Sequence, residues 1–167
     1  RQSVIGMGSF RADVLVEDGK IRALGGREEI AALCGEDLSG GRPRAGAAGP
    51  DQGDFQIIDA SGCLVFPGFI DAHTHFDLHV AGTVTADDFA TGTRAAVRGG
   101  TTTIVDFATQ YPGESLAEGL ANWREKAEGG CSCDYGFHMS ITEWTPVVSR
   151  EMDAMMIAGV TSFKLYI

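Results

Sequence analysis

The chain has 167 residues, of which 44% are hydrophobic and 22% are charged, a composition typical of a folded globular protein. Its 13 lysines and arginines against 23 aspartates and glutamates leave a formal net charge of -10, which opposes a surface that neutralises nucleic-acid phosphates. No apolar run approaches the roughly 20 residues that span a bilayer, and we recognise no secretion signal. We expect a cytoplasmic protein with neither a nucleic-acid nor a membrane partner.

The cysteines are too few and too irregularly spaced to indicate a disulfide framework, since only Cys34, Cys63, Cys131 and Cys133 are present. Cys131 and Cys133 are alternatively a metal or redox pair, but such pairs usually have two or more residues between the thiols. We therefore predict four reduced thiols.

The first part of the chain has a β pattern. Two short apolar-rich runs between residues 12 and 24 flank Asp18-Gly19, a pair that favours the positive φ angles of a tight hairpin turn. Residues 40–54 are mostly Gly, Ala and Pro and predict a loop. A further strand is predicted over 56–59, so we assign residues 1–63 to the amino-terminal part of a small β domain.

From residue 64 onward, predicted strands and helices alternate, which is typical of a parallel sheet. The first helix begins at a capping box over Thr85 to Asp88 and ends at Gly99-Gly100. The next two helices place apolar residues at helical spacing on their inward faces. The predicted strands cover 64–70, 101–108, 134–141 and a segment from Thr161; the second and third helices cover 114–128, with Leu116, Leu120, Trp123 and Ala127 inward, and 147–158, with Val148, Met152, Met155 and Met156 inward.

The alternation predicts an α/β fold, either a doubly wound sheet or the start of a (β/α)8 barrel. Both need more chain than residues 64–167, because a closed eight-stranded barrel takes about 250 residues. The sequence ends at Ile167 inside a predicted strand, and Arg1 is not an initiating methionine. We therefore expect a fragment of a longer protein.

Two histidines, His73 and His75, follow the first predicted parallel strand. Side chains at i and i+2 of an extended segment point to the same side, so both imidazoles are able to bind one metal ion. They also lie near the carboxyl end of the strand, where α/β folds place their ligands. The alternative is that they are ordinary polar residues at a strand end. Asp71 is either a hydrogen-bond partner of the histidine pair or only a cap at the end of the strand.

Lys164 lies among Phe163, Leu165 and Tyr166 in the last predicted strand. Burying its charge is costly and favours the neutral amine, which can react with carbon dioxide to give an anionic carbamate able to bridge two cations. The alternative is a lysine whose stem packs while its ammonium group reaches solvent. His138, in the middle of a strand, is interpreted as a hydrogen-bonded core histidine.

Taken together, these segments resemble the dihydropyrimidinase and D-hydantoinase group of the amidohydrolase superfamily. The resemblance covers nearly all of residues 56–167, and the hairpin at 12–24 also fits. The matching segments are 67–75, which contains His73 and His75, then 82–93, 99–107, 134–139 and 161–164, which ends at Lys164.

The resemblance implies a (β/α)8 barrel, of which this chain holds the first four strands, preceded by part of a small β-sandwich. It implies hydrolysis of a dihydropyrimidine or 5-substituted hydantoin ring to an N-carbamoyl amino acid. His73 and His75 would bind the more buried of two zinc ions, and carboxylated Lys164 would bridge both. Hydroxide held between the metals would attack the ring amide carbonyl.

By the same resemblance, Val80 and Tyr166 would contact the ring substituent of the substrate, with simple packing as the alternative. The remaining metal ligands and the general base would lie beyond Ile167, so the fragment alone is expected to be inactive. A homotetramer is implied for the full-length protein.

Two alternatives remain within the superfamily. One is a non-catalytic interaction protein of the collapsin-response-mediator kind, and the other is a sibling enzyme such as allantoinase or dihydroorotase. Intact His73, His75 and Lys164 favour an enzyme, because the non-catalytic relatives lose metal ligands. Residues 76–83 resemble the dihydropyrimidinase version of this segment more than the sibling versions.

Overall fold

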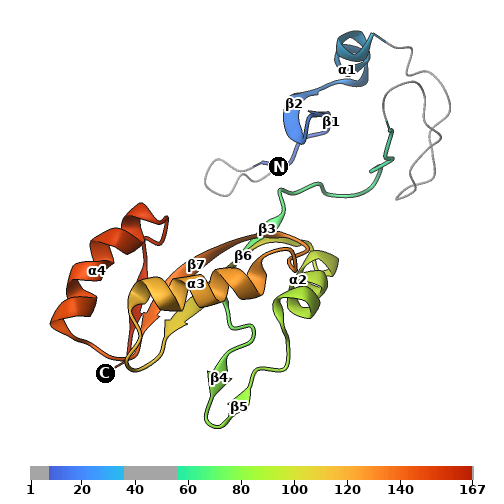
Figure 1. Ribbon diagram of the computed structural model, residues 1–167. Coiled ribbons are helices and arrows are strands. Elements are labelled where there is room, and N and C mark those ends of the chain that lie inside the picture. The colour runs from blue at the N-terminus through green and yellow to red at the C-terminus, as the bar shows by residue number, and fades with distance from the viewer. Residues whose placement is uncertain (1–7, 36–55, 167) are drawn as a thin grey trace. The chain divides into compact units, whose positions relative to one another are not determined.

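The structure is a computed structural model that describes residues 8–35 and 56–166 (Figure 1). The chain divides into two units, Arg1–Val65 and Phe66–Ile167, and each is described by itself. The loop predicted at 40–54 lies outside the described residues.

The first unit contains the predicted hairpin. Strand β1 (Asp13–Glu17) pairs antiparallel with β2 (Lys20–Gly25). The turn residues Asp18 and Gly19 have φ angles of 50° and 72°, as a two-residue turn that follows the twist of its strands requires. The prediction of a hairpin is therefore confirmed.

A short helix that the sequence pattern did not indicate follows the hairpin. Helix α1 (Arg27–Cys34) begins where the Glu29 carboxylate accepts a hydrogen bond from the Gly26 N–H at 2.9 Å. Ile30 is the one buried side chain of this helix. Because so few apolar residues face inward, the sequence pattern was too weak to predict the helix. The strand predicted over 56–59 is wrong, because among these residues only Ile58 forms an isolated bridge.

The second unit is built on a four-stranded parallel sheet in the order β3-β6-β7-β8. Each strand pairs with the next parallel strand along the chain, as the alternation of strands and helices predicts. Strand β7 has the predicted bounds and β6 runs two residues longer than predicted. The strands are β3 (Phe69–Thr74), β6 (Thr101–Gln110), β7 (Asp134–Ile141) and β8 (Phe163–Leu165).

Strand β3 begins five residues later than the predicted start at residue 64. Pro67 has no N–H to donate to a ladder. Gly68 passes so close to β6 that a Cβ atom there would lie 1.8 Å from the Thr102 hydroxyl oxygen. The apolar residues before Pro67 therefore form no strand, and β3 runs on through His73.

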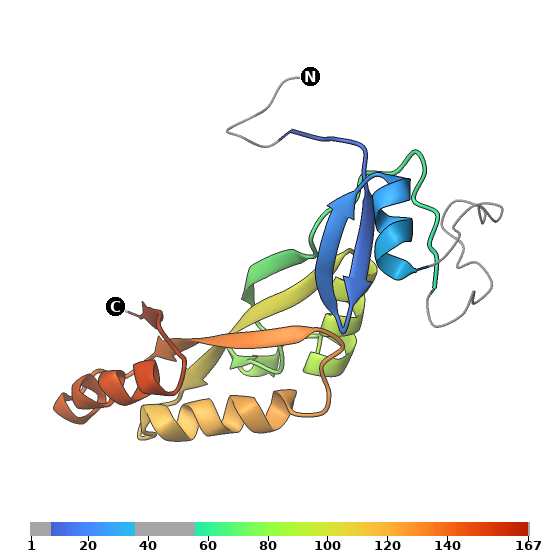
Figure 2. The same ribbon diagram turned by 90° about the horizontal axis from the view of Figure 1, so that it is seen from above.

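Three helices connect the parallel strands, and α3 lies along one face of the sheet (Figures 1 and 2). The predicted inward face of α3 is confirmed, because the four residues predicted to face inward are all at most 2% exposed. In α4 Met155 is buried but Met156 is 56% exposed, so the inward placement of Met156 is wrong; adjacent helical residues point about 100° apart. The helices are α2 (Phe89–Arg98), α3 (Leu116–Ala127) and α4 (Pro146–Ile157).

The start of α2 also differs from its prediction. The N-cap is Asp88, whose carboxylate accepts the Thr91 N–H at 2.7 Å. The hydroxyl of Thr85 instead accepts the Leu78 N–H at 3.0 Å. This bond closes a small hairpin, β4 (His79–Val80) and β5 (Thr83–Val84), that stands between β3 and α2 (Figure 1).

Candidate metal centre

The two histidines lie where strand β3 ends. His73 is the fifth residue of β3 and His75 follows its last residue. Their rings meet edge to face, with centroids 5.1 Å apart, so both imidazoles lie on the same side of the strand as predicted.

The ring of Phe107, on β6, joins the histidines to the lysine. Its centroid is 4.7 Å from that of His73 and 4.9 Å from that of His75. The Lys164 Nζ lies 4.8 Å from the same centroid. The structure therefore brings together His73 on β3, His75 just past its end and Lys164 on β8. They surround an aromatic side chain for which the sequence had suggested no role.

The electrostatic surroundings of His75 favour its neutral form. Burial lowers its pKa, the charges of Lys164 and His73 lower it further, and the Asp106 carboxylate opposes the shift. The Nδ1 atom of His75 is buried without a hydrogen-bond partner. A neutral imidazole with a free ring nitrogen is what a metal ligand must present, so the pair fits a metal ion that takes nitrogen ligands, such as zinc.

The described residues contain no group of three His, Cys, Asp or Glu side chains placed to hold a metal. Lys164 is the remaining side chain at the pair, and a lysine ammonium has no lone pair to donate. Once carboxylated, it would present anionic oxygens. The donor set within 8–35 and 56–166 is thus two imidazoles and a lysine that needs this modification.

His138 is not available as a further ligand. Its Nδ1 bonds to the Ser162 hydroxyl, and its Nε2 lies 2.9 Å from the carbonyl oxygen of Ala72. Both ring nitrogens are occupied, which confirms that this histidine is hydrogen-bonded, but its side chain is half-buried and does not belong to the core. These bonds link β7 to β3 and to the residue before β8.

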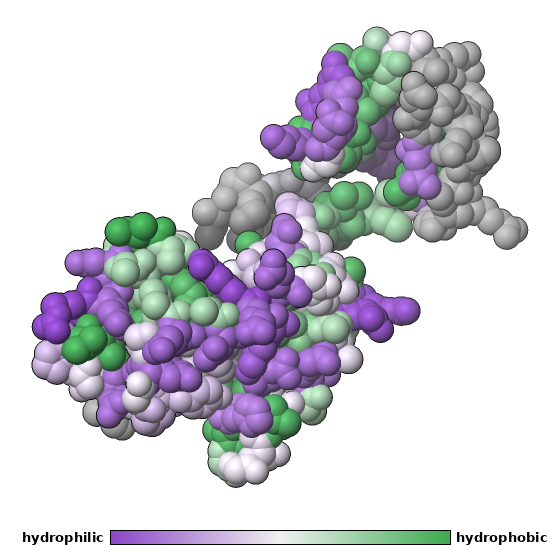
Figure 3. Space-filling model, in the orientation of Figure 1, coloured by the Kyte–Doolittle hydropathy of each residue, from purple (hydrophilic) through white to green (hydrophobic). Residues whose placement is uncertain are grey.

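The two predicted substrate contacts lie in different places. Tyr166, just past β8, has its ring centroid 5.2 Å from the Lys164 Nζ, and it is 53% exposed. Val80 is on β4 and is 51% exposed. Together with Val84 it gives the β4–β5 hairpin the hydrophobic surface seen at the bottom of Figure 3.

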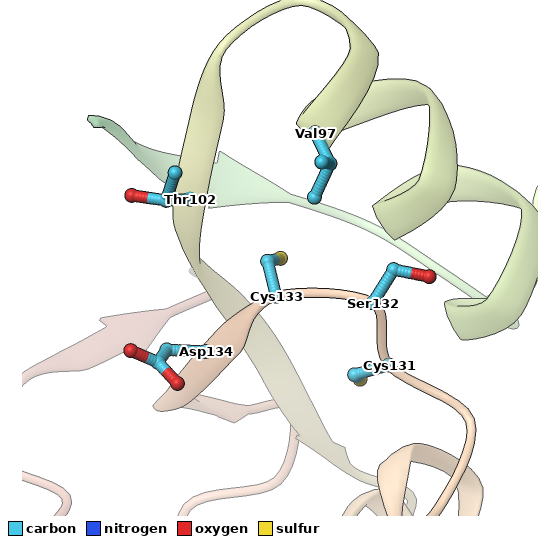
Figure 4. Close-up of a pocket in the computed structure, with 6 residues that line it drawn as sticks. All are labelled: Val97, Thr102, Cys131, Ser132, Cys133 and Asp134. Atoms are coloured by element: carbon cyan, nitrogen blue, oxygen red, sulfur yellow. The ribbon is translucent and has the colours of Figure 1, made fainter. Parts of the chain in front are cut away.

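A pocket of about 430 Å³ lies at the other end of the sheet, where β6 and β7 begin (Figure 4). Burial raises the pKa of the Cys131 thiol to about 11 and also raises that of Cys133. Such thiols stay protonated at neutral pH and make poor metal ligands. All four cysteines lie within the described residues, and none of them is paired in a disulfide. The pocket is lined by Val97, Thr102, Cys131, Ser132, Cys133 and Asp134.

The structure is an α/β fold that carries a histidine pair at the end of its first parallel strand, where such folds place ligand sites. The sequence profile of the amidohydrolase family matches residues 64–155. The chain belongs to this family. No helix within the described residues has the length and apolar character needed to cross a membrane.

Named relatives place the similarity within one branch of the family. The chain is 47% identical over 157 residues to a D-hydantoinase of Streptomyces coelicolor, covering 94% of this chain and 30% of the relative. It is 42% identical over 156 residues to a dihydropyrimidinase of Rattus norvegicus, covering 93% of this chain and 27% of the relative. The chain therefore spans less than a third of the length of these relatives.

Solved structures show the same likeness. A D-hydantoinase crystal structure superposes with a TM-score of 0.76 at 39% identity, covering 94% of this chain and 30% of that one. A dihydropyrimidinase from Brevibacillus agri gives a TM-score of 0.73 at 39% identity, covering 92% and 29%. The resemblance to D-hydantoinases and dihydropyrimidinases is confirmed, and with it the α/β fold.

Proposed function

We propose that this chain contributes half of a two-zinc centre to an enzyme that hydrolyses a cyclic amide, either a dihydropyrimidine or a 5-substituted hydantoin, to an N-carbamoyl amino acid. The observation that carries the proposal is the convergence of His73, His75 and Lys164 on the ring of Phe107. The names of the similar proteins supply the substrate class.

His73 and His75 would hold one zinc ion through ring nitrogens of their imidazoles. Lys164, carboxylated on Nζ, would be an anionic oxygen ligand shared by the two ions. When bound, the zinc pair would supply a nucleophile from water at neutral pH and polarise the amide carbonyl. The chain's own residues fix the angle between the imidazoles and bring the lysine to them.

The remaining parts of the proposal concern the whole protein. The sequential strand order and the helix along one face support a (β/α)8 barrel, of which β3, β6, β7 and β8 would be the first four strands. Residues 1–63 would form part of a β-sandwich. Because this chain holds only part of the donor set, we expect it to be inactive alone. The complete enzyme would be a cytoplasmic homotetramer.

Tyr166 and Val80 would contact the ring substituent of the substrate. Tyr166 is supported by its ring beside the Lys164 Nζ. Val80 is supported by its exposed place on the hairpin that follows the histidines.

A chimera tests the proposal. The residues of this chain would replace the matching segment of the Streptomyces coelicolor D-hydantoinase, to which it is 47% identical. We expect two zinc ions per subunit and hydrolysis of both hydantoin and dihydrouracil. His73→Ala and Lys164→Ala should each lose zinc and activity, and short carboxylic acids should partly rescue Lys164→Ala.

Two matched variants serve as controls. His79→Ala removes an exposed histidine outside the pair and Lys20→Ala an exposed lysine of the hairpin; both should keep the full zinc content. A folded chimera whose zinc content and turnover do not change in Lys164→Ala would contradict the carbamate. A folded chimera that binds no zinc would contradict the metal centre.

A further inference from the structure

Asp106 is a fully buried carboxylate that faces away from the histidine pair. It precedes Phe107 on β6, and because strand side chains alternate, it points to the helix side of the sheet while Phe107 points to the histidines. Its exposed fraction is 0%. A carboxylate in such a place needs hydrogen-bond donors for both oxygens.

Each oxygen of Asp106 accepts two hydrogen bonds. One oxygen accepts the Thr74 hydroxyl at 2.7 Å and the Phe76 N–H at 3.0 Å. The other accepts the Phe107 N–H at 2.8 Å and the Trp123 indole N–H at 3.1 Å. Asp106 therefore connects α3 to the residues that alternate with His73 and His75 along the chain.

The same segment is held at two further points. The backbone of Asp77 has a positive φ of 49°, and the Lys126 Nζ donates to its carbonyl oxygen at 2.8 Å. The ring of Phe76 lies against Gly92 of α2, where a Cβ atom would approach it to 2.2 Å. Thr74 and Phe76, which alternate with the histidines, are thus fixed on the side opposite the imidazoles, and Asp77 is fixed through its carbonyl oxygen.

We propose that Asp106 is a positioning residue for the metal centre: by holding Thr74 and Phe76, it sets the relative orientation of the His73 and His75 rings before any metal binds. This inference rests on the proposed function only for the identity of the ion. The orientation itself is a property of the metal-free chain. Ligands held in place in this way lose less conformational freedom on binding, which raises metal affinity.

Two variants weaken the contacts of Asp106 without changing the histidines. In Asp106→Asn only one acceptor oxygen remains for two pairs of donors, so one pair always faces an amide NH₂ group. Thr74→Val removes the hydroxyl and keeps the shape, and Thr74→Ser is its conservative partner because it restores the donor. Leu120→Ala, which opens a cavity in α3, controls for loss of stability alone.

The test combines NMR of the metal-free 167-residue chain with zinc titration of the chimera with the Streptomyces coelicolor D-hydantoinase. In the wild type we expect ring-to-ring NOEs among His73, His75 and Phe107, and zinc binding that His73→Ala removes. In Asp106→Asn and Thr74→Val the NOEs should weaken and the Kd for zinc should rise roughly tenfold. Thr74→Ser and Leu120→Ala should keep both, although Leu120→Ala lowers the Tm.

Unchanged NOEs in both Asp106→Asn and Thr74→Val would overturn the proposal, as would an equal loss of NOEs in Leu120→Ala, which would mark a general effect of stability. A wild-type chain that shows the NOEs but whose chimera binds no zinc at the histidines would count against the proposed function. In that case the NOEs of the variants still decide whether Asp106 positions the rings.

Discussion

The Nζ atom of Lys164 lies 4.8 Å from the centroid of the Phe107 ring, the same ring that His73 and His75 contact from the other edge of the sheet. Phe107 is 7% exposed and also meets His138 at 4.7 Å. Four polar side chains therefore contact this one aromatic ring: those of His73, His75, His138 and Lys164. An aromatic face also attracts a cation placed over it, which favours this position of the lysine.

Phe107→Ala should therefore destabilise the second unit by about 3 kcal/mol, the usual cost of removing a buried phenylalanine. Urea unfolding followed by tryptophan fluorescence measures the change. Phe66→Ala, which removes a ring that is 63% exposed, is the matched control and should change stability by less than about 0.5 kcal/mol. Equal losses in the two variants would contradict the role of Phe107.

Gly92→Ala should destabilise the chain although alanine is the better helix former. A Cβ atom at this position would lie 2.2 Å from the Phe76 ring, and overpacking of this kind costs about 1–3 kcal/mol, more than the gain of about 1 kcal/mol in helix propensity.

Thermal unfolding measures the Gly92→Ala effect. Gly136→Ala is the control, because a Cβ atom there meets nothing within 4 Å. We expect a lower Tm for Gly92→Ala alone. A Tm equal to that of the wild type would show that the Phe76 ring moves aside freely.

The thiol of Cys131 should react slowly with iodoacetamide. Its pKa is raised to about 11 by burial, to which the neighbouring Cys133 and Asp106 add, so only about 0.1% of it is thiolate at pH 8. Its labelling rate should rise about tenfold per pH unit up to pH about 11. Mass spectrometry of the labelled native chain should find exposed Cys63 modified first, and early modification of Cys131 at pH 8 would contradict its burial.

The raised pKa of Cys131 also makes the free energy of unfolding depend on pH. A folded-state pKa of about 11 against a reference of 9.0 means that the folded chain holds this proton more tightly than the unfolded chain. The contribution to stability is fully present below pH 9 and is lost as the pH rises from 9 to 11. Cys131→Ser should flatten the decline of the Tm in this interval, and an unchanged decline would assign it to other groups.

The β1–β2 turn predicts a contrast between two variants at Gly19. With φ at 72°, a β-branched residue is strained there, so Gly19→Val should cost the hairpin about 1–2 kcal/mol. Gly19→Asn should cost much less, because asparagine tolerates the left-handed region. Hydrogen exchange at the amides of β1 and β2 reports the difference, and equal exchange in the two variants would exclude this turn geometry.

Local patterns predicted most of the second unit. The bounds of β7 and the buried face of α3 with Trp123 follow from spacing within a dozen residues, and the His73 and His75 pair follows from alternation within a strand. These features depend on side-chain direction along a single element, which the sequence carries directly. The prediction that His73 and Lys164 belong to one site came from the family resemblance.

The role of Asp106 was beyond local reasoning. Its four donors include Thr74, 32 positions earlier, and Trp123, 17 positions later. The register between β3 and β6 brings Thr74 to it, and the packing of α3 against β6 brings Trp123. The start of β3 was misplaced for a similar reason, since the contact between Gly68 and Thr102 is not visible in either segment alone. Tertiary contacts of this kind override local propensity.

Strand β6 lies between the candidate metal centre and the helical layer, and the side chains of its successive residues point alternately to these two sides. Ile104 and Ala108 belong to the hydrophobic core and Asp106 binds Trp123, whereas Phe107 meets the histidines. In a saturation scan of this strand, substitutions at 104 and 108 should therefore lower protein abundance alone, whereas those at 106 and 107 should also lower the zinc content of the variants that still fold.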